Sequence, residues 1–173
     1  MATSPRPGFA TALAESGVLA ALAGFDARVV GTPPLGLDLP GSDIDVVCHA
    51  PDGIAFAHRI WEAFAHEQCF ALRQWRGGER AIIAAFEAFG WPFEIFAAPR
   101  PVQEQAGWRH FEVERRLLAL GGAALRERVM ARRRAGMKTE PAFADALGLA
   151  GDPYRAMIDL YGLPDDALAR LVG

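Results

Sequence analysis

The sequence has little of several features that mark special classes of protein. Its 173 residues include only two cysteines, Cys48 and Cys69, and their spacing is not that of a metal site. We therefore expect two buried, free thiols, as is typical of a reducing compartment. No apolar run approaches the roughly 20 residues that cross a bilayer, and the first residues lack a signal-peptide pattern. These absences predict a cytoplasmic protein without a membrane partner.

Lysine is also scarce, because Lys138 is the only one, and the formal net charge is −3. This balance argues against general DNA binding. Basic residues gather late in the chain, at Arg126, Arg128, Arg132, Arg133, Arg134 and Lys138. Such a run is usually a solvated helix face, and the alternative is that some members contact substrate phosphates.

Apolar residues make up 51% of the chain, which is enough for one well-packed domain. Their periodicity and the turn residues between them predict an α+β order of elements. We expect a helical segment over 9–22, strands over 27–30 and 44–49, a helix over 53–67, strands over 69–74, 80–89 and 92–98, and helices from there to the end.

The segment 30–47 is the most informative one for function, because Asp43 and Asp45 flank Ile44 in a hydrophobic run. Side chains alternate along a strand, so the two carboxylates should point to the same face. Burying two carboxylates side by side is costly unless a cation or hydrogen bonds neutralise them. Mg²⁺ commonly takes one or two carboxylates and completes its shell with water and substrate phosphates. The segment therefore predicts a metal site and phosphate chemistry.

A glycine turn precedes these acids. The strand over 27–30 should end at Gly31, where the missing side chain lets backbone amides approach an anion. Thr32 is expected to be a helix N-cap with Pro33 at the first helical position, which would aim free N–H groups at a phosphate. Pro33 and Pro34, however, supply no side-chain donors.

The Gly31-Thr32 pair, a further glycine at Gly36 and the run 42–45 (Ser-Asp-Ile-Asp) resemble the signature of the DNA polymerase beta-like nucleotidyltransferase superfamily in its small, minimal form. That pattern includes a third acid in a later strand, and Glu94 is the only charge within 91–97. The stretches 137–143 and 151–154 resemble a small bacterial family of unknown function within this superfamily. The resemblance covers nearly the whole chain.

The resemblance implies a nucleotidyltransferase-like mixed β-sheet with helices packed on it, within residues 1–100. Residues 101–173 would be a C-terminal helical extension of the same compact unit. Asp43, Asp45 and Glu94 would be the catalytic residues and would hold two Mg²⁺ or Mn²⁺ ions.

The implied reaction is transfer of a nucleoside monophosphate from a nucleoside triphosphate, such as ATP, to an unknown hydroxyl acceptor with release of pyrophosphate. Gly31, Thr32, Ser42, Arg109 and Lys138 are the candidate nucleotide-binding residues. The acceptor is a small molecule, an RNA end or a protein side chain, and no residue selects among them.

Other interpretations stay open. The same metal site would suit a hydrolase of dinucleoside polyphosphates, and a non-catalytic nucleotide-binding or partner-binding module would keep the fold. Residues 39–43 are also ordinary turn residues. A glutamate on an edge strand that faces water would give the same sequence pattern as Glu94. An exposed helix face would also explain the polar residues Arg109 and His110.

Overall fold

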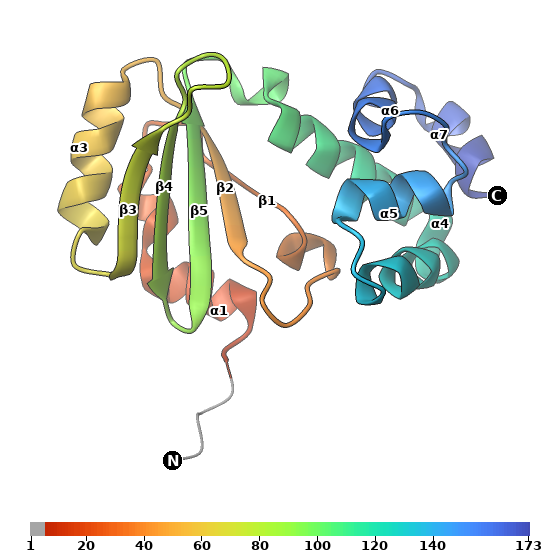
Figure 1. Cartoon of the computed structure of the whole chain (residues 1–173), viewed down its shortest axis with the longest axis horizontal. Helices are drawn as coiled ribbons and strands as arrows, with labels where there is room; N and C mark the ends of the chain where they lie inside the picture. Colours follow the sequence, from red (N-terminus) through yellow and green to blue (C-terminus); the bar gives the residue numbers. More distant parts are fainter. Residues whose placement is uncertain (1–5) are drawn as a thin grey trace. The chain divides into compact units, whose positions relative to one another are not determined.

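A computed structural model describes residues 6–173. By their contacts the residues form two compact units, Met1–Gln105 and Ala106–Gly173. The first unit is the α+β part and holds every strand of the described chain, whereas the second is helical (Figure 1). The predicted α+β class with a mixed sheet is confirmed.

The first unit begins with two short helices and alternates afterwards between strands and connecting helices. The predicted helical segment 9–22 is interrupted at Gly17, whose backbone is left-handed with φ 64°. In chain order the elements are α1 (Phe9–Ser16), α2 (Val18–Ala21), β1 (Arg28–Val30), the 3-10 helix η1 (Pro33–Leu35), β2 (Ile44–His49), α3 (Gly53–Phe64), β3 (Gln68–Gln74), β4 (Ile82–Ala88), β5 (Trp91–Ala98) and the 3-10 helix η2 (Val102–Glu104).

The five strands form one mixed sheet in the order β1-β2-β5-β4-β3. The three later strands are the antiparallel meander that the turn residues predict, although β4 is shorter than 80–89. Arg80 and Phe89 have positive φ angles of 58° and 52°, outside the extended region of regular strands, and β4 lies between them. The strands β2 and β5 are parallel and adjacent, in the register Asp45 to Glu94.

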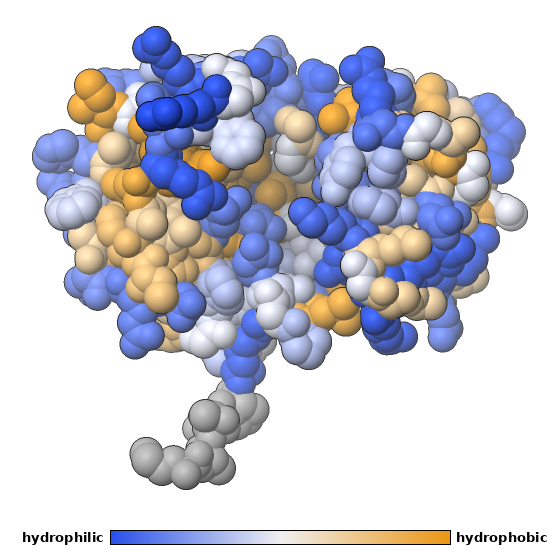
Figure 2. All heavy atoms as spheres, in the orientation of Figure 1, coloured by the Kyte–Doolittle hydropathy of each residue, from blue (hydrophilic) through white to orange (hydrophobic). Residues whose placement is uncertain are grey.

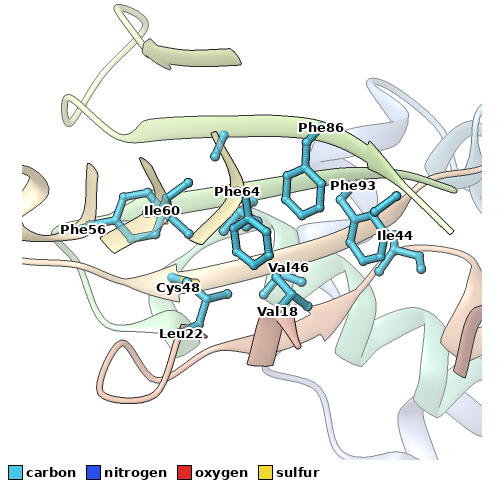
Figure 3. Packing of buried hydrophobic residues seen from close by; sticks show 14 of the residues in the cluster. Val18, Leu22, Ile44, Val46, Cys48, Phe56, Ile60, Phe64, Phe86 and Phe93 are labelled. Atoms are coloured by element: carbon cyan, nitrogen blue, oxygen red, sulfur yellow. The ribbon is translucent and has the colours of Figure 1, made fainter. Parts of the chain in front are cut away.

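One face of this sheet carries the hydrophobic core of the first unit. Alternate residues of β2, β4 and β5 pack there against α1, α2 and α3 (Figure 3). Phe64 of α3 stacks on Phe86, which stacks on Phe93, with ring centroids 4.6 and 4.9 Å apart. Asp52 caps α3 by accepting hydrogen bonds from the N–H groups of Ile54 and Ala55. The packing leaves the opposite face of the sheet for the polar residues of β2 and β5.

The second unit consists of α4 (Ala106–Arg134), α5 (Thr139–Ala146), α6 (Pro153–Asp159) and α7 (Asp165–Val172). Gly122 interrupts α4, because its backbone has the non-helical angles φ 56° and ψ −148°. The helix α4 packs against the other three. Arg116 of α4 donates hydrogen bonds to the carboxylate of Asp165 and to the carbonyl oxygen of Leu163, which fixes the start of α7.

The two thiols lie in different surroundings. Cys48 is buried in β2, and burial together with the nearby Asp26 raises the pKa of its thiol to about 12. The expectation that Cys69 is buried is wrong, since it is exposed in the edge strand β3. Phe70 and Leu72 pack on the core, so side-chain alternation leaves Cys69 on the exposed face of this edge strand, beside a register shift between Gln68 and Ala71. Within residues 6–173, every helix is too short or too polar to cross a bilayer.

Candidate active site

Asp45 and Glu94 lie side by side on the face of the sheet opposite the hydrophobic core. They are register partners on the parallel strands β2 and β5. Their sequence neighbours Ile44, Val46 and Ile95 are buried in the core, so the two carboxylates point the other way, and both are half-buried. Adjacent strands are about 4.8 Å apart. Two acids that are distant in sequence therefore form one acidic pair.

Arg73 of β3 supplies a positive charge to this pair. Its Nη2 donates a hydrogen bond to Oε2 of Glu94 at 3.3 Å. Both side chains are substantially exposed, 57% for Arg73 and 43% for Glu94, so solvent weakens the attraction. The guanidinium of Arg73 is therefore the cation that neutralises Glu94.

Gly31 packs directly against Asp45. Val30, the last residue of β1, is the register partner of Asp45, and Gly31 follows it with φ 78°. A Cβ atom at Gly31 would overlap Oδ2 of Asp45 and lie 3.2 Å from its Cγ. Both the backbone angle and the contact thus require glycine at this position.

Thr32 and Ser42 hold the two ends of the loop between β1 and β2 together. The Thr32 hydroxyl donates to Oγ of Ser42 at 3.4 Å. The Ser42 hydroxyl accepts the N–H of Leu39 at 2.9 Å, and the Ser42 N–H donates to the Leu39 carbonyl oxygen at 2.9 Å. Arg6 donates to the Ser42 carbonyl oxygen at 3.1 Å. These bonds fix the segment that leads from the glycine turn to Asp43.

The helix start predicted at Thr32 is present, but the helix is the short 3-10 helix η1 with Pro33 at its first position. Thr32 occupies the N-cap position of η1, but its side chain caps no N–H group. Pro33 and Pro34 have no N–H to offer, and the N–H of Leu35 donates to the Thr32 carbonyl oxygen at 3.1 Å. Anion binding here would instead use the turn itself, where Gly31 with positive φ precedes Thr32 in the right-handed region. When a left-handed and a right-handed residue follow one another, their N–H groups point toward one site, where an anion can bind.

Asp43 is placed differently from the other two acids. It is exposed and lies before β2, outside the strand ladder. Among residues 6–173 there is no group of three or more His, Cys, Asp or Glu side chains arranged to hold a metal ion. The pair of Asp45 and Glu94 nevertheless fits Mg²⁺ by its chemistry, since this ion takes one or two carboxylates and fills its shell with phosphate oxygens.

The remaining candidate residues belong to the second unit. Arg109 lies over the ring of Tyr161, with Cζ 5.3 Å from the ring centroid. Lys138 is exposed at the N-cap position of α5. Nucleotide contacts by Arg109 and Lys138 stay predictions.

His110 has a structural role within that unit. Its Nδ1 lies 3.1 Å from Oε1 of Glu140 and its Nε2 lies 3.1 Å from the carbonyl oxygen of Tyr154. Burial raises the pKa of Glu140, but hydrogen bonds from His110 and from the backbone outweigh burial and lower it. The neighbouring Glu114 is buried, and burial followed by repulsion from Glu140 raises its pKa well above the ordinary value. The two contacts of His110 thus tie α4 to α5 and α6.

Solved structures share the fold of this chain. A Cid1 poly(U) polymerase with MgGTP bound has a TM-score of 0.58 and 16% identity, covering 81% of this chain and 47% of that one. A cytoplasmic RNA terminal U-transferase scores 0.54 at 17% identity, with 80% and 43% covered. The GLD-2/RNP-8 complex scores 0.51 at 10% identity, with 92% and 71% covered.

These neighbours belong to the DNA polymerase beta-like nucleotidyltransferase superfamily, and at such identities the likeness concerns the fold. The chain spans about half the length of the poly(U) polymerase chain that it matches. Comparison with curated proteins gives no match. A family model matches residues 11–160, so the chain belongs to the family described as Domain of unknown function (DUF4269).

Proposed function

We propose that this protein is a metal-dependent nucleotidyltransferase, which moves a nucleoside monophosphate from a nucleoside triphosphate to a hydroxyl acceptor. One observation carries the proposal. Asp45 and Glu94 are register partners on parallel strands, and Gly31 is packed against Asp45 with no room for a side chain. A carboxylate pair beside a glycine turn provides metal ligands next to a place where a triphosphate can approach the backbone.

The fold neighbours support the nucleotide part of the proposal. Cid1 poly(U) polymerase structures hold MgGTP, Mg 3′-dATP and the UTP analogue UMPNPP. In this chain, Mg²⁺ or Mn²⁺ would be held by Asp45 and Glu94, with Asp43 as a further ligand. Two bound ions would neutralise the triphosphate and lower the pKa of the acceptor hydroxyl.

Residues of the site would accept the proton of the acceptor and bind the departing phosphates. Glu94 would accept the proton of the acceptor hydroxyl on a carboxylate oxygen. The acceptor oxygen forms a bond to the α-phosphorus while the bond from that phosphorus to the bridging oxygen breaks, and pyrophosphate leaves. Backbone N–H groups at Gly31 and Thr32, with the Ser42 hydroxyl beside them, would hold the departing phosphates. Such a displacement depends mainly on positioning and on charge stabilisation.

A specific observation supports one alternative, the non-catalytic nucleotide-binding module. Because Arg73 already neutralises Glu94, the acidic pair persists at little cost without a metal, as a non-catalytic nucleotide-binding module would require. The dinucleoside polyphosphate hydrolase uses the same carboxylates and differs only in the acceptor, which is water.

A nucleotide screen separates these functions. The protein is incubated with each ribonucleoside triphosphate, Mg²⁺ or Mn²⁺, and pools of small hydroxylated molecules, RNA oligonucleotides or protein. Pyrophosphate release together with a mass increase of one nucleoside monophosphate on an acceptor supports the transferase. Cleavage of dinucleoside polyphosphates without an adduct indicates the hydrolase. Nucleotide binding with neither product indicates the binding module.

A further inference from the structure

One row of residues crosses the sheet on the face opposite the core, and the acidic pair divides this row into two sides. Register pairs place Ala71 of β3 beside Ala85 of β4, Ala85 beside Glu94, Glu94 beside Asp45, and Asp45 beside Val30 of β1. Gly31 follows Val30, so the glycine turn lies on the β1 side of the acidic pair. The side toward β4 and β3 carries only alanine methyl groups in this row.

These alanines leave a shallow floor beside Glu94. Ala71 is exposed and Ala85 is half-buried, so small side chains form the sheet surface there, and Arg73 extends over it to reach Glu94. Hydrophobic side chains gather over β3 and β4 on this face, with hydrophilic side chains beside them (Figure 2). If a triphosphate occupies the β1 side, an acceptor has room on this floor, next to the carboxylate proposed to receive its proton.

Arg73 borders the same floor. It lies two residues after Ala71, on the same face of β3, and reaches across β4 to Glu94. An exposed ion pair of this kind is worth about 0–1 kcal/mol, so the guanidinium can leave Glu94 at small cost. When Glu94 binds a metal ion, the guanidinium faces a second cation instead of a carboxylate, and its best remaining partner is an anion.

We propose that Arg73 neutralises Glu94 in the metal-free protein and, once Glu94 binds metal, binds a phosphate group of the acceptor. The acceptor is then a phosphorylated molecule with a hydroxyl group near its phosphate. An RNA end and a small sugar phosphate both have this chemistry. The inference rests on the proposed function, because it assumes that Glu94 is a metal ligand.

Two variants and a matched control test the proposal. Arg73→Gln removes the charge, and Arg73→Lys keeps the charge without the planar fork of donors. Arg28→Gln is the control, because Arg28 is an exposed arginine on the same sheet face, at β1, where it pairs with Asp26 at 2.6 Å. Thermal melting of each variant verifies that it is folded.

The first measurement is calorimetric titration with Mn²⁺ in the presence of a non-hydrolysable ATP analogue. Removing a competing cation should tighten Mn²⁺ binding by up to about fivefold in Arg73→Gln and leave it unchanged in Arg28→Gln. The second measurement is equilibrium dialysis of the loaded protein against ribose 5-phosphate and, separately, a hexaribonucleotide. Arg73→Gln should bind the preferred phosphate probe at least about tenfold more weakly, with Arg73→Lys between it and the wild type.

The probe that binds identifies the source of the phosphate. If the wild-type protein binds Mn²⁺ and nucleotide but Arg73→Gln changes neither measurement, the role of Arg73 is wrong and the proposed function stands. If neither phosphate probe binds the loaded wild-type protein, the role of Arg73 is likewise wrong and the proposed function stands. If the wild-type protein binds no Mn²⁺ with nucleotide, both proposals are wrong.

Discussion

Gly31 and Asp45 are in contact so close that a side chain on the glycine would overlap the carboxylate. Replacing Gly31 by alanine should therefore displace Asp45 and also strain a backbone with φ 78°. We expect Gly31→Ala to lower the free energy of unfolding by more than the roughly 1–2 kcal/mol that positive φ alone costs an alanine. It should also abolish metal-dependent nucleotide binding.

Gly41→Ala is the matched control for that variant. Gly41 also has positive φ, 91°, but nothing lies within 4 Å of its added Cβ. Gly41→Ala should lower the free energy of unfolding only by the cost of positive φ, and it should keep nucleotide binding. Chemical denaturation and calorimetry measure both effects, and equal losses in the two variants would contradict a special contact at Gly31.

Asp43 lies before β2 and is the proposed further metal ligand. Because its side chain is exposed and outside the strand ladder, Asp43→Asn should leave the melting temperature of the metal-free protein almost unchanged. If Asp43 is a ligand as proposed, the same variant should bind Mn²⁺ with nucleotide at least about tenfold more weakly. Undiminished binding would restrict the metal ligands to Asp45 and Glu94.

Glu114 makes the second unit sensitive to pH. Burial raises its pKa in the folded chain well above the ordinary value of 4.5, so the folded state binds a proton that the unfolded state releases. Its contribution to stability is therefore fully present below pH 4.5 and is lost as pH rises toward the folded pKa. Glu114→Gln should melt at a higher temperature than the wild type at pH 8, and the difference should vanish near pH 4.5.

Glu127→Gln is the control for this prediction, since Glu127 is an exposed glutamate on the same helix. Its melting curve should follow that of the wild type across the pH range. The interpretation of Glu114 would fail if Glu114→Gln were less stable than the wild type at pH 8.

The two cysteines should differ in reactivity. A thiol-specific reagent such as Ellman's reagent should modify the exposed Cys69 rapidly in the native protein. Cys48 should react only on unfolding, because it is buried and its pKa is raised to about 12. Cys69→Ser should remove the fast phase alone. Two fast phases in native protein would contradict the packing of β2.

Much of the fold follows from local patterns that can be read in the sequence. The helix that Asp52 caps, the meander ending at Ala98 and the break at Gly122 depend on nearby residues, and each is present. The helix start at Thr32 is also present, as the 3-10 helix η1, although its two consecutive prolines have no N–H group to offer a phosphate. Cys69 is exposed because Phe70 and Leu72 take the core-facing positions of β3 and because β3 is the edge strand, a position that only the assembled sheet defines.

The candidate site depends on register, which local patterns do not specify. Isolated acids in two hydrophobic strands indicated Asp45 and Glu94, and the structure makes them partners. Arg73 was missed, because an arginine in an exposed edge strand has no distinguishing sequence pattern. Its relation to Glu94 arises only when β4 places the two strands at a fixed separation.

The central claim is that Asp45 and Glu94 bind a metal ion together with a nucleoside triphosphate. The most direct test is the melting temperature of the protein with Mg²⁺, with each ribonucleoside triphosphate, and with both together. A ligand at a hundredfold excess over its Kd adds about 2.7 kcal/mol of stability. We predict that the combined shift exceeds the sum of the separate shifts, and that Asp45→Ala removes the excess while remaining folded. Additive shifts for every nucleotide, or an excess that persists in Asp45→Ala, would contradict the claim.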